Sequence, residues 1–245
     1  MTGPARGPRL SPWGRLVAVS AALIGGAAVL LVGWGLASAH ERRVSYQVRG
    51  SLEGLVLDVG AADVDIVGGG RRRAVQVVQT DSYAFGHGVR TRRSVAGGVF
   101  RVRSRCPVMA FARSCAVAYR LSVPDNVPVT VRTGAGSVRF RDYRGSAWVG
   151  TGSGDVEVES FCGFSLEVRS EAGDVHADTA CPLQRLSLRT TSGAIRAVVP
   201  SARYRVDAES STGSAVVRGL VAAPDALFEL QALSTSGDVT VETRG

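Results

Sequence analysis

A glycine-centred turn recurs through the C-terminal half of the chain and constrains its fold more than any other feature. In most copies Ser or Thr precedes the glycine, and Asp, Ser or Ala follows it. The six anchoring glycines are Gly136, Gly154, Gly173, Gly193, Gly213 and Gly237. Their separations are 18, 19, 20, 20 and 24 residues. A period this short does not suit a propeller blade, and it indicates a stack of small repeated units.

Apolar residues alternate with polar ones on both sides of each turn. In the Gly154 copy the apolar positions are Ala147 and Val149 before the turn, and Val156 and Val158 after it. Alternation with a period of two around a turn indicates strand, turn, strand, with one wet face. An earlier stretch, residues 55–66, fits the same frame. We therefore predict an all-β fold, a single-rung-repeat β-solenoid with rungs of about 20 residues, each packed on equivalent residues above and below.

The N-terminal 39 residues have a different character. Three arginines precede an uncharged stretch at 16–39, which is long enough to span a bilayer, since about 20 apolar residues suffice. We expect a transmembrane helix there, preceded by a short basic cytoplasmic tail at 1–15. The alternative is a signal peptide cleaved near Ala39, because Ala37-Ser38-Ala39 forms a small-residue site.

Both interpretations place residues 40–245 outside the cytoplasm, either on a single-pass membrane protein or in a secreted one. Within that part we expect two regions. A membrane-proximal β region with a basic segment covers 40–124, and the repeat solenoid covers 125–245.

The four cysteines provide a test of this frame. Cys162 and Cys181 each follow their turn glycine by eight residues, so stacking places them about 4.8 Å apart. That separation suits a disulfide, and we predict a Cys162–Cys181 bridge. Cys106 and Cys115 would then pair across a hairpin loop. Two bridges are consistent with a location outside the cytoplasm, and the cysteine spacing does not fit a zinc site.

The turn repeat resembles a known bacterial family. Together with the entry Tyr119–Pro124 leading into 127–133, it is similar to the β-strand-repeat proteins called "putative adhesin", which are of unknown function. The resemblance covers roughly 50–245 and rests on the rhythm of the repeat. It implies a solenoid behind a single membrane helix, and it transfers no catalytic residues.

Charge is unevenly distributed. Residues 71–120 hold eleven arginines and one acid, whereas 121–245 hold twelve arginines and fifteen acids. A basic surface favours anionic partners such as lipid headgroups or cell-wall polymers, and location disfavours nucleic acid. Biased codon usage explains an arginine-rich solvated face equally well, because the chain contains no lysine. The candidate contacts with an anionic surface are Arg71, Arg72, Arg73, Arg90, Arg92 and Arg93.

Aspartates recur directly after the turn glycines, at Asp155, Asp174 and Asp238. Stacked aspartates are typical of calcium-binding β-rolls, but the full glycine-aspartate pattern is absent and Asp is an ordinary turn residue. We therefore expect no metal site and no cofactor.

Acids also alternate along the strands. Asp155, Glu157 and Glu159 follow one turn, with Glu167, Glu171 and Asp174 one rung further on, as in solenoid enzymes that act on polysaccharides. Outward alternation is also the normal pattern of a solvated strand, and no nucleophile has a histidine in a recognisable constellation. We predict that the chain is not an enzyme.

The sequence thus favours a membrane-anchored, extracytoplasmic, non-enzymatic β-repeat module for envelope binding or scaffolding, adhesin-like in character. The alternative is a membrane-tethered regulatory or sensor partner in an envelope-stress system. That role would have to act through another membrane protein, since 1–15 leaves no room for a signalling domain. An uncapped solenoid end after Val241 would leave free strand edges for self-association.

Overall fold

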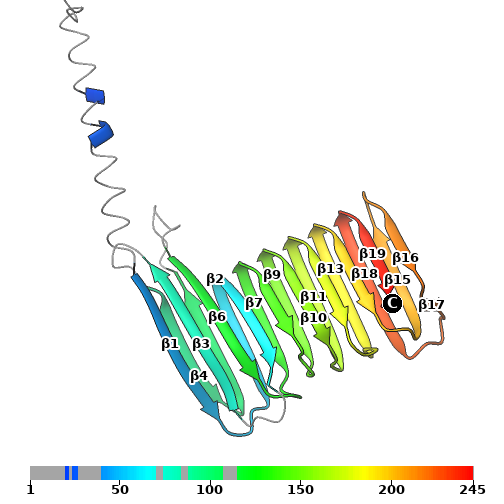
Figure 1. The fold of residues 1–245 in the computed structure, drawn as a ribbon, viewed down its shortest axis with the longest axis horizontal. Helices are drawn as coiled ribbons and strands as arrows, with labels where there is room; N and C mark the ends of the chain where they lie inside the picture. Colours follow the sequence, from blue (N-terminus) through cyan, green and yellow to red (C-terminus); the bar gives the residue numbers. More distant parts are fainter. Residues whose placement is uncertain are drawn as a thin grey trace, which may run out of the picture.

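The computed structural model describes residues 20, 21, 24–26, 40–69, 74–83, 88–106 and 115–244. Within this part of the chain, no helix has the length and apolar character needed to cross a membrane. The stretch 16–39, expected to be a transmembrane helix, lies almost wholly outside the described residues. The predicted all-β, solenoid-like fold is confirmed in residues 54–68, 99–105 and 115–243, where parallel strands stack in a long ladder (Figure 1).

Each rung consists of one strand in each of two facing sheets. The first strand of the rung lies in sheet B, a turn follows, and the second strand returns in sheet A. Five rungs are β7 (Val129–Ala135) with β8 (Val138–Arg141), β9 (Ala147–Ser153) with β10 (Val156–Phe161), β11 (Ser165–Ala172) with β12 (Val175–Thr179), β13 (Arg185–Ser192) with β14 (Ile195–Val199), and β18 (Phe228–Ser236) with β19 (Val239–Thr243).

The long strand β2 (Gly54–Gly68) forms a complete rung on its own. Its first half pairs with β7 in sheet B, where Leu55 lies opposite Val129. Its second half pairs with β8 in sheet A, where Val64 lies opposite Val138. The early copy expected at 55–66 is therefore confirmed.

The last two rungs are stacked in the reverse of their chain order. The rung β18–β19 lies next to β13 and β14, and the rung formed by β15 (Arg203–Ser210) and β16 (Ala215–Arg218) lies beyond it, at the end of the ladder. A two-residue strand, β17 (Val221–Ala222), pairs with the start of β15. The expectation that the C-terminal rung ends the solenoid is therefore wrong, because that rung is inserted one place inside (Figure 1).

At the other end, antiparallel strands cover the ladder. β5 (Val99–Arg105) and β6 (Cys115–Val123) form the next rung beyond β2, in sheets B and A respectively. β4 (Arg90–Ala96) then pairs antiparallel with β5, β3 (Ala74–Tyr83) with β6, and β1 (His40–Arg49) with β3. We call β1, β3 and β4 the cap.

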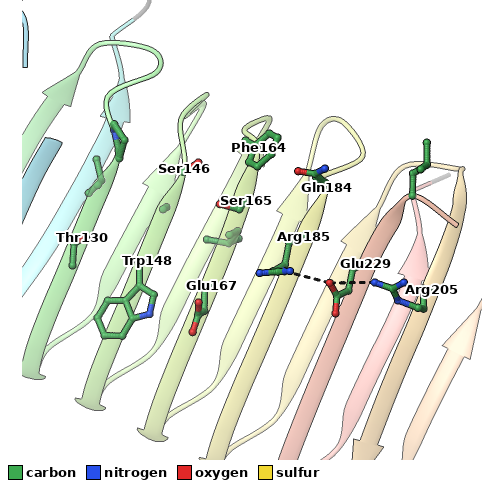
Figure 2. Close-up of a pocket in the computed structure, with 15 residues that line it drawn as sticks. Thr130, Ser146, Trp148, Phe164, Ser165, Glu167, Gln184, Arg185, Arg205 and Glu229 are labelled. Atoms are coloured by element: carbon green, nitrogen blue, oxygen red, sulfur yellow. Dashed lines mark hydrogen bonds and ion pairs between the residues drawn. The ribbon is translucent and has the colours of Figure 1, made fainter. Parts of the chain in front are cut away.

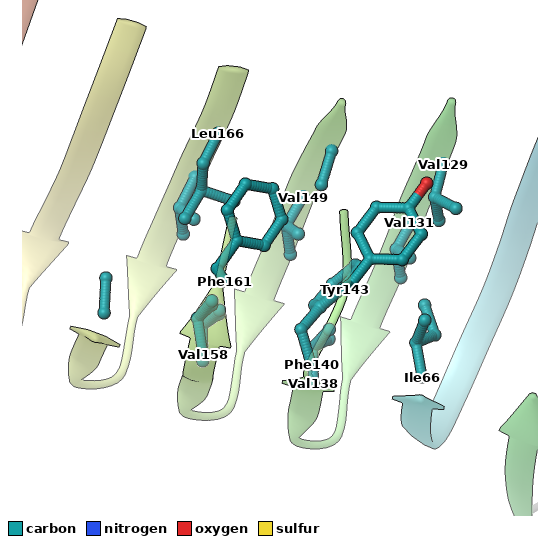
Figure 3. Packing of buried hydrophobic residues seen from close by; sticks show 14 of the residues in the cluster. Ile66, Val129, Val131, Val138, Phe140, Tyr143, Val149, Val158, Phe161 and Leu166 are labelled. Atoms are coloured by element: carbon teal, nitrogen blue, oxygen red, sulfur yellow. The ribbon is translucent and has the colours of Figure 1, made fainter. Parts of the chain in front are cut away.

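The core is a narrow column of apolar side chains between the sheets. Inward positions at equivalent heights stack from rung to rung, as Leu166, Leu186 and Leu230 do. Aromatic rings fill the wider part, where Tyr143 contacts Phe140 and Phe161 with centroids 5.7 and 5.8 Å apart (Figure 3). Burial of these apolar side chains stabilises the stack, by about 25 cal/mol for each Å² of apolar surface removed from water.

The turn glycines form a second column. Gly154 has φ of 130°, and a Cβ there would lie 2.3 Å from the carbonyl oxygen of Gly136 in the rung before it. Each turn rests on its neighbour in the same way, and Gly237 lies over Gly193 rather than over Gly213. Glycine is required because a side chain fits neither this backbone conformation nor the space.

Candidate functional site

The outer face of sheet B begins with a cluster of arginines. On β5 the alternation turns Phe100, Val102 and Ser104 inward, so the intervening arginines point to solvent. On β4, Arg90 lies opposite Arg105 and Arg92 opposite Arg103. We call this cluster the arginine band. Its members are Arg90, Arg92, Arg101, Arg103 and Arg105.

The band is only partly neutralised. Asp58, on β2, is the one acid that pairs with it in the described chain, at 2.8 Å from Arg105 and 3.4 Å from Arg103. Like charges directly opposite one another on a sheet repel, and the side chains there are well exposed. The band therefore holds a positive potential that an anionic partner would relieve.

Arg93 does not belong to this face. Its guanidinium lies 4.1 Å from the centroid of the Tyr46 ring and donates a hydrogen bond to Gln79 Oε1 at 2.8 Å. Its role is structural, in the cap. Of the six arginines singled out from the sequence, Arg90 and Arg92 lie in the band, and 71–73 lie outside the described residues.

Next along the same face lies an aromatic platform. Trp148, on β9, extends over its own strand, and a Cβ at Gly150 would approach Cη2 of the indole to 2.6 Å (Figure 2). The absence of a side chain at Gly150 lets the ring lie close to the sheet. Arg132, from the neighbouring strand β7, places its guanidinium 5.3 Å from the ring centroid, within the range of a cation–π contact.

Two shallow depressions border Trp148. One, of about 520 Å³, runs toward the start of the strands and is lined by Phe164, Glu167, Arg185 and Glu229 among others (Figure 2). The other, of about 770 Å³, runs toward the turns past Arg132, Arg169 and Arg189. Together they make an elongated surface, crossing several rungs, that mixes an aromatic ring with charged and hydroxyl groups.

The distal part of sheet B pairs its charges internally. Glu229 accepts from Arg185 at 3.2 Å and lies 3.4 Å from Arg205, while Arg169 pairs with Glu167 at 2.7 Å. Arg189 donates to Gln231 rather than to an acid. The excess of positive charge on this face is therefore concentrated at the arginine band.

Sheet A is likewise balanced on its outer face. Arg139 lies 2.6 Å from Glu157, and this guanidinium holds the pKa of the Glu157 carboxyl below its ordinary value. Arg120 and Arg141 both pair with Asp65, at 3.1 and 2.6 Å. This face is a ladder of exposed ion pairs, each of which contributes little to stability.

The acids weighed as a catalytic group do not share one face. Glu157 and Glu159 lie on β10 in sheet A, whereas Glu167 and Glu171 lie on β11 in sheet B. The structure therefore does not bring these acids together on one face. The rung folds back at its turn, and the strands before and after the turn point their polar residues in opposite directions.

The turn aspartates bind the backbone of the next rung. Asp155 Oδ1 accepts from the amide N–H of Asp174 at 2.9 Å, and Asp174 Oδ1 accepts from that of Ala194 at 2.8 Å. Asp238 does the same for Ser214, and the amide and hydroxyl of Ser214 hold the pKa of that carboxyl below its ordinary value. These contacts match the interpretation as turn residues. No group of three or more metal-ligating side chains occurs among the described residues.

Both predicted disulfides are present. Cys162 and Cys181 join adjacent rungs with their Cα atoms 5.1 Å apart, and Cys106 and Cys115 are joined with Cα atoms 6.0 Å apart. The second bridge does not close a hairpin, because β5 and β6 lie in different sheets. It occupies the place where other rungs have a glycine turn.

Comparison with known proteins agrees with this architecture. Residues 127–219 match the family model described as Toastrack DUF4097. A crystal structure of a "putative cell adhesion protein" from Clostridium sporogenes ATCC 15579 is similar at a TM-score of 0.55, with 10% identity over 84% of this chain and 100% of the other. That likeness shows the fold, and with the family match it confirms the resemblance to bacterial adhesin-like repeat proteins.

Two further solved structures are more distant. A "putative adhesin" from Bacteroides fragilis NCTC 9343 has a TM-score of 0.36, with 12% identity over 83% of this chain and 97% of the other. A "putative lipid binding protein" from Parabacteroides distasonis ATCC 8503 has a TM-score of 0.33, with 9% identity over 83% and 97% of the two chains. No curated protein matches the sequence.

Sequence reasoning missed several residues of this face. Arg101, Arg103 and Arg105 alternate on one strand, and that period-two spacing was the signal for a shared face. Trp148 carried no such signal, because its position over Gly150 follows from the register of β7, β9 and β11. The sequence does not display that register directly.

Proposed function

We propose that this chain, built around a Toastrack domain, is a non-enzymatic envelope module that binds an anionic cell-wall polymer along the outer face of sheet B. The observation that carries the proposal is the arginine band, five arginines accompanied by one acid within the described chain, continuous with the Trp148 platform. Guanidinium groups bind phosphate and carboxylate through paired hydrogen bonds, and an indole face packs against the apolar side of a sugar ring.

A polymer fits this surface better than a bilayer does. The depressions beside Trp148 are elongated and lined by charged and hydroxyl side chains together with Phe164 and Leu227, so they offer separate hydrogen bonds and apolar contacts along a chain. A bilayer-binding face would instead present clustered large apolar side chains around its basic residues. The exposed large apolar side chains of this region are instead spread along the ladder, with Val95 next to the band and Phe164 and Leu227 in one of the depressions beside Trp148.

The proposed location is outside the cytoplasm, with the apolar stretch at 16–39 serving as anchor or leader. The two disulfides support this location, because such bridges persist in oxidising compartments. A non-enzymatic role is supported by the division of the candidate acids between two faces and by the ion pair that engages Glu157.

The test is co-sedimentation of the full chain, in mild detergent, with isolated anionic cell-wall polymer across a salt series. We expect binding to weaken about tenfold between roughly 0.05 and 0.2 M salt, since the contacts are between exposed charges. The double variant Arg90→Gln/Arg92→Gln should lose most of the binding. The matched control, Arg139→Gln/Arg196→Gln, removes the same charge from sheet A and should leave binding unchanged.

Two results would contradict the proposal. Equal losses in both double variants would show that binding depends on net charge and not on this face. Binding to anionic vesicles but not to the polymer would assign the band to lipid headgroups instead.

A further inference from the structure

The distal end of the ladder has free strand edges. β16 pairs with β19 on one side and with no strand of the described chain on the other. β15 pairs with β18 along its length, but on its outer edge only Arg203 and Tyr204 are matched, by β17. The backbone of 205–210 and of 215–218 therefore faces outward with no strand beside it.

The apolar column continues to this edge without a cover. At the equivalent heights inside the ladder, Val239 and Val241 are fully buried. In the terminal rung Ala215 is exposed, and 43% of Val217 is accessible to solvent. Val206 and Ala208 on β15 are half-buried, although Leu230 and Ala232 beside them are fully buried. The terminal rung thus has the inward-facing apolar residues of an interior rung, but no further rung of the described chain covers them.

We propose that a second copy of this chain covers the terminal rung, forming an isologous dimer about a two-fold axis parallel to the strands. Such an axis exchanges the two sheets, so β15 of each copy lies beside β16 of the other. The two strands of a rung run in opposite directions, and the new pairs are therefore antiparallel.

The turn fixes the register of this pairing. In the neighbouring rung β18 ends at Ser236 and β19 begins at Val239, so positions equally far from these two residues lie at equal heights. β15 and β16 take the same heights, because Ser210 lies opposite Ser234 and Ala215 opposite Val239. An axis along the strands preserves height. It therefore places Ser210 opposite Val217 of the second copy and Glu209 opposite Arg218, and each inward-facing row continues across the interface. The strand β17, at Arg203 and Tyr204, lies beyond the paired segment and does not obstruct it.

Charge complementarity favours this arrangement over its alternative. The same register sets Glu209 opposite Arg218 of the second copy, and the symmetry repeats the contact. Within one copy these side chains point outward from different sheets and do not meet. No ion pair of Arg218 occurs in the described chain. An axis perpendicular to the sheets at the height of Ala208 would instead oppose Asp207 and Glu209, which repel.

The test is sedimentation of the full chain in mild detergent over a concentration series. Val217→Arg should abolish the dimer, because it places a charge in the apolar row. Val95→Arg, the matched control, alters an exposed valine of the cap at the opposite end and should leave the dimer intact. A melting curve for each variant separates loss of association from loss of folding.

A charge exchange tests the register directly. Glu209→Arg and Arg218→Glu should each weaken the dimer about tenfold, since each converts two attractive contacts into repulsive ones. The double variant should restore association to nearly the original level.

Three results would overturn the proposal. The chain remains monomeric at all concentrations, or its dimer survives Val217→Arg, or the charge exchange gives no rescue. Capture of a different protein by the wild type but not by Val217→Arg, with the chain itself monomeric, would assign the edge to a heterologous partner.

Discussion

The two ends of the solenoid differ in how the outermost rung is covered. At the proximal end the cap lays antiparallel strands over the last parallel rung, and a polar network lies beneath them. Gln79 donates to Asp81 at 2.7 Å and to Thr91 at 3.0 Å, and it accepts from Arg93. Gln79 and Asp81 are buried, so their mutual bonding offsets the loss of water.

The distal end has no such layer among the described residues. Its outermost strands, β15 and β16, keep the alternation of an interior rung and expose it. The comparison teaches that a repeat sequence specifies stacking without specifying where stacking stops. A cap needs residues that depart from the repeat, and in the described chain those residues occur only in 40–106.

The largest effect we expect comes from the disulfide between rungs. Replacing Cys162 and Cys181 with alanine should lower the free energy of unfolding by about 3 kcal/mol, because the bridge restricts the unfolded chain. Replacing Cys106 and Cys115 should lower it slightly less, since that bridge spans 9 residues rather than 19. Urea titration measures both. Identical midpoints for the first variant and wild type would contradict the prediction.

A matched pair of valines compares the ends themselves. Val102, on β5 under the cap, is fully buried, whereas Val206 on β15 is half-buried. Val102→Ala should lower stability by about 2–3 kcal/mol and Val206→Ala by less than about 1 kcal/mol in the monomer. Thermal or urea unfolding at low protein concentration checks this. Equal losses would mean that the distal end is as well covered as the proximal one.

Two tyrosines extend the comparison to polar groups. The hydroxyl of Tyr204, at the distal end, donates to the carbonyl of Pro200 at 2.9 Å. The hydroxyl of Tyr46, on β1 in the cap, is buried without a hydrogen-bond partner in the described chain. Tyr204→Phe should therefore lower stability by about 1 kcal/mol, and Tyr46→Phe should leave it unchanged or slightly higher. A substantial loss in Tyr46→Phe would indicate a partner that the fold alone does not provide.

The smallest effect concerns alkaline pH. Burial raises the pKa of both Tyr46 and Tyr204 from 10.0 to about 12. The folded chain then holds each phenol proton more tightly than the unfolded chain. The associated stability is complete below pH 10 and is lost as the pH rises toward 12. Absorbance titration near 295 nm should show both ionising late, and each Phe variant should remove one late step.

Much of the distal fold was predictable because the repeat shows which residues occupy equivalent positions in neighbouring rungs. The glycine turns, the apolar rows and the Cys162–Cys181 bridge all follow from equivalent positions in neighbouring rungs. The resemblance to adhesin-like repeat proteins rested on the same rhythm.

The order of the last two rungs was not predictable from that rhythm. Leu188, Ala208 and Ala232 occupy equivalent positions, so the pattern cannot say which strand lies next to β13. The available signal was the longer spacing of 24 residues between Gly213 and Gly237. The additional chain forms β17 and the return to the interior of the ladder.

The candidate site was half visible in the sequence. Arg90 and Arg92 were found from charge density alone, but that density also included Arg93, whose side chain lies over the Tyr46 ring and not in the band. Which way a side chain points depends on strand pairing, and the cap pairs its strands antiparallel, outside the repeat pattern. For the same reason, the sequence alone does not show that the acids of β10 and those of β11 lie in different sheets.

Engineered disulfides test the rung order most directly. Arg189 lies opposite Leu233 in the parallel register of β13 and β18, so the two residues occupy equivalent positions in neighbouring rungs, as Cys162 and Cys181 do. The variant Arg189→Cys/Leu233→Cys should form a bridge, detected by mass spectrometry of unreduced peptides. Arg189→Cys/Glu209→Cys should not, because β18 separates those strands. A bridge between 189 and 209, with none between 189 and 233, would show that the rungs stack in chain order. That result would contradict the finding that β15 and β16 form the terminal rung.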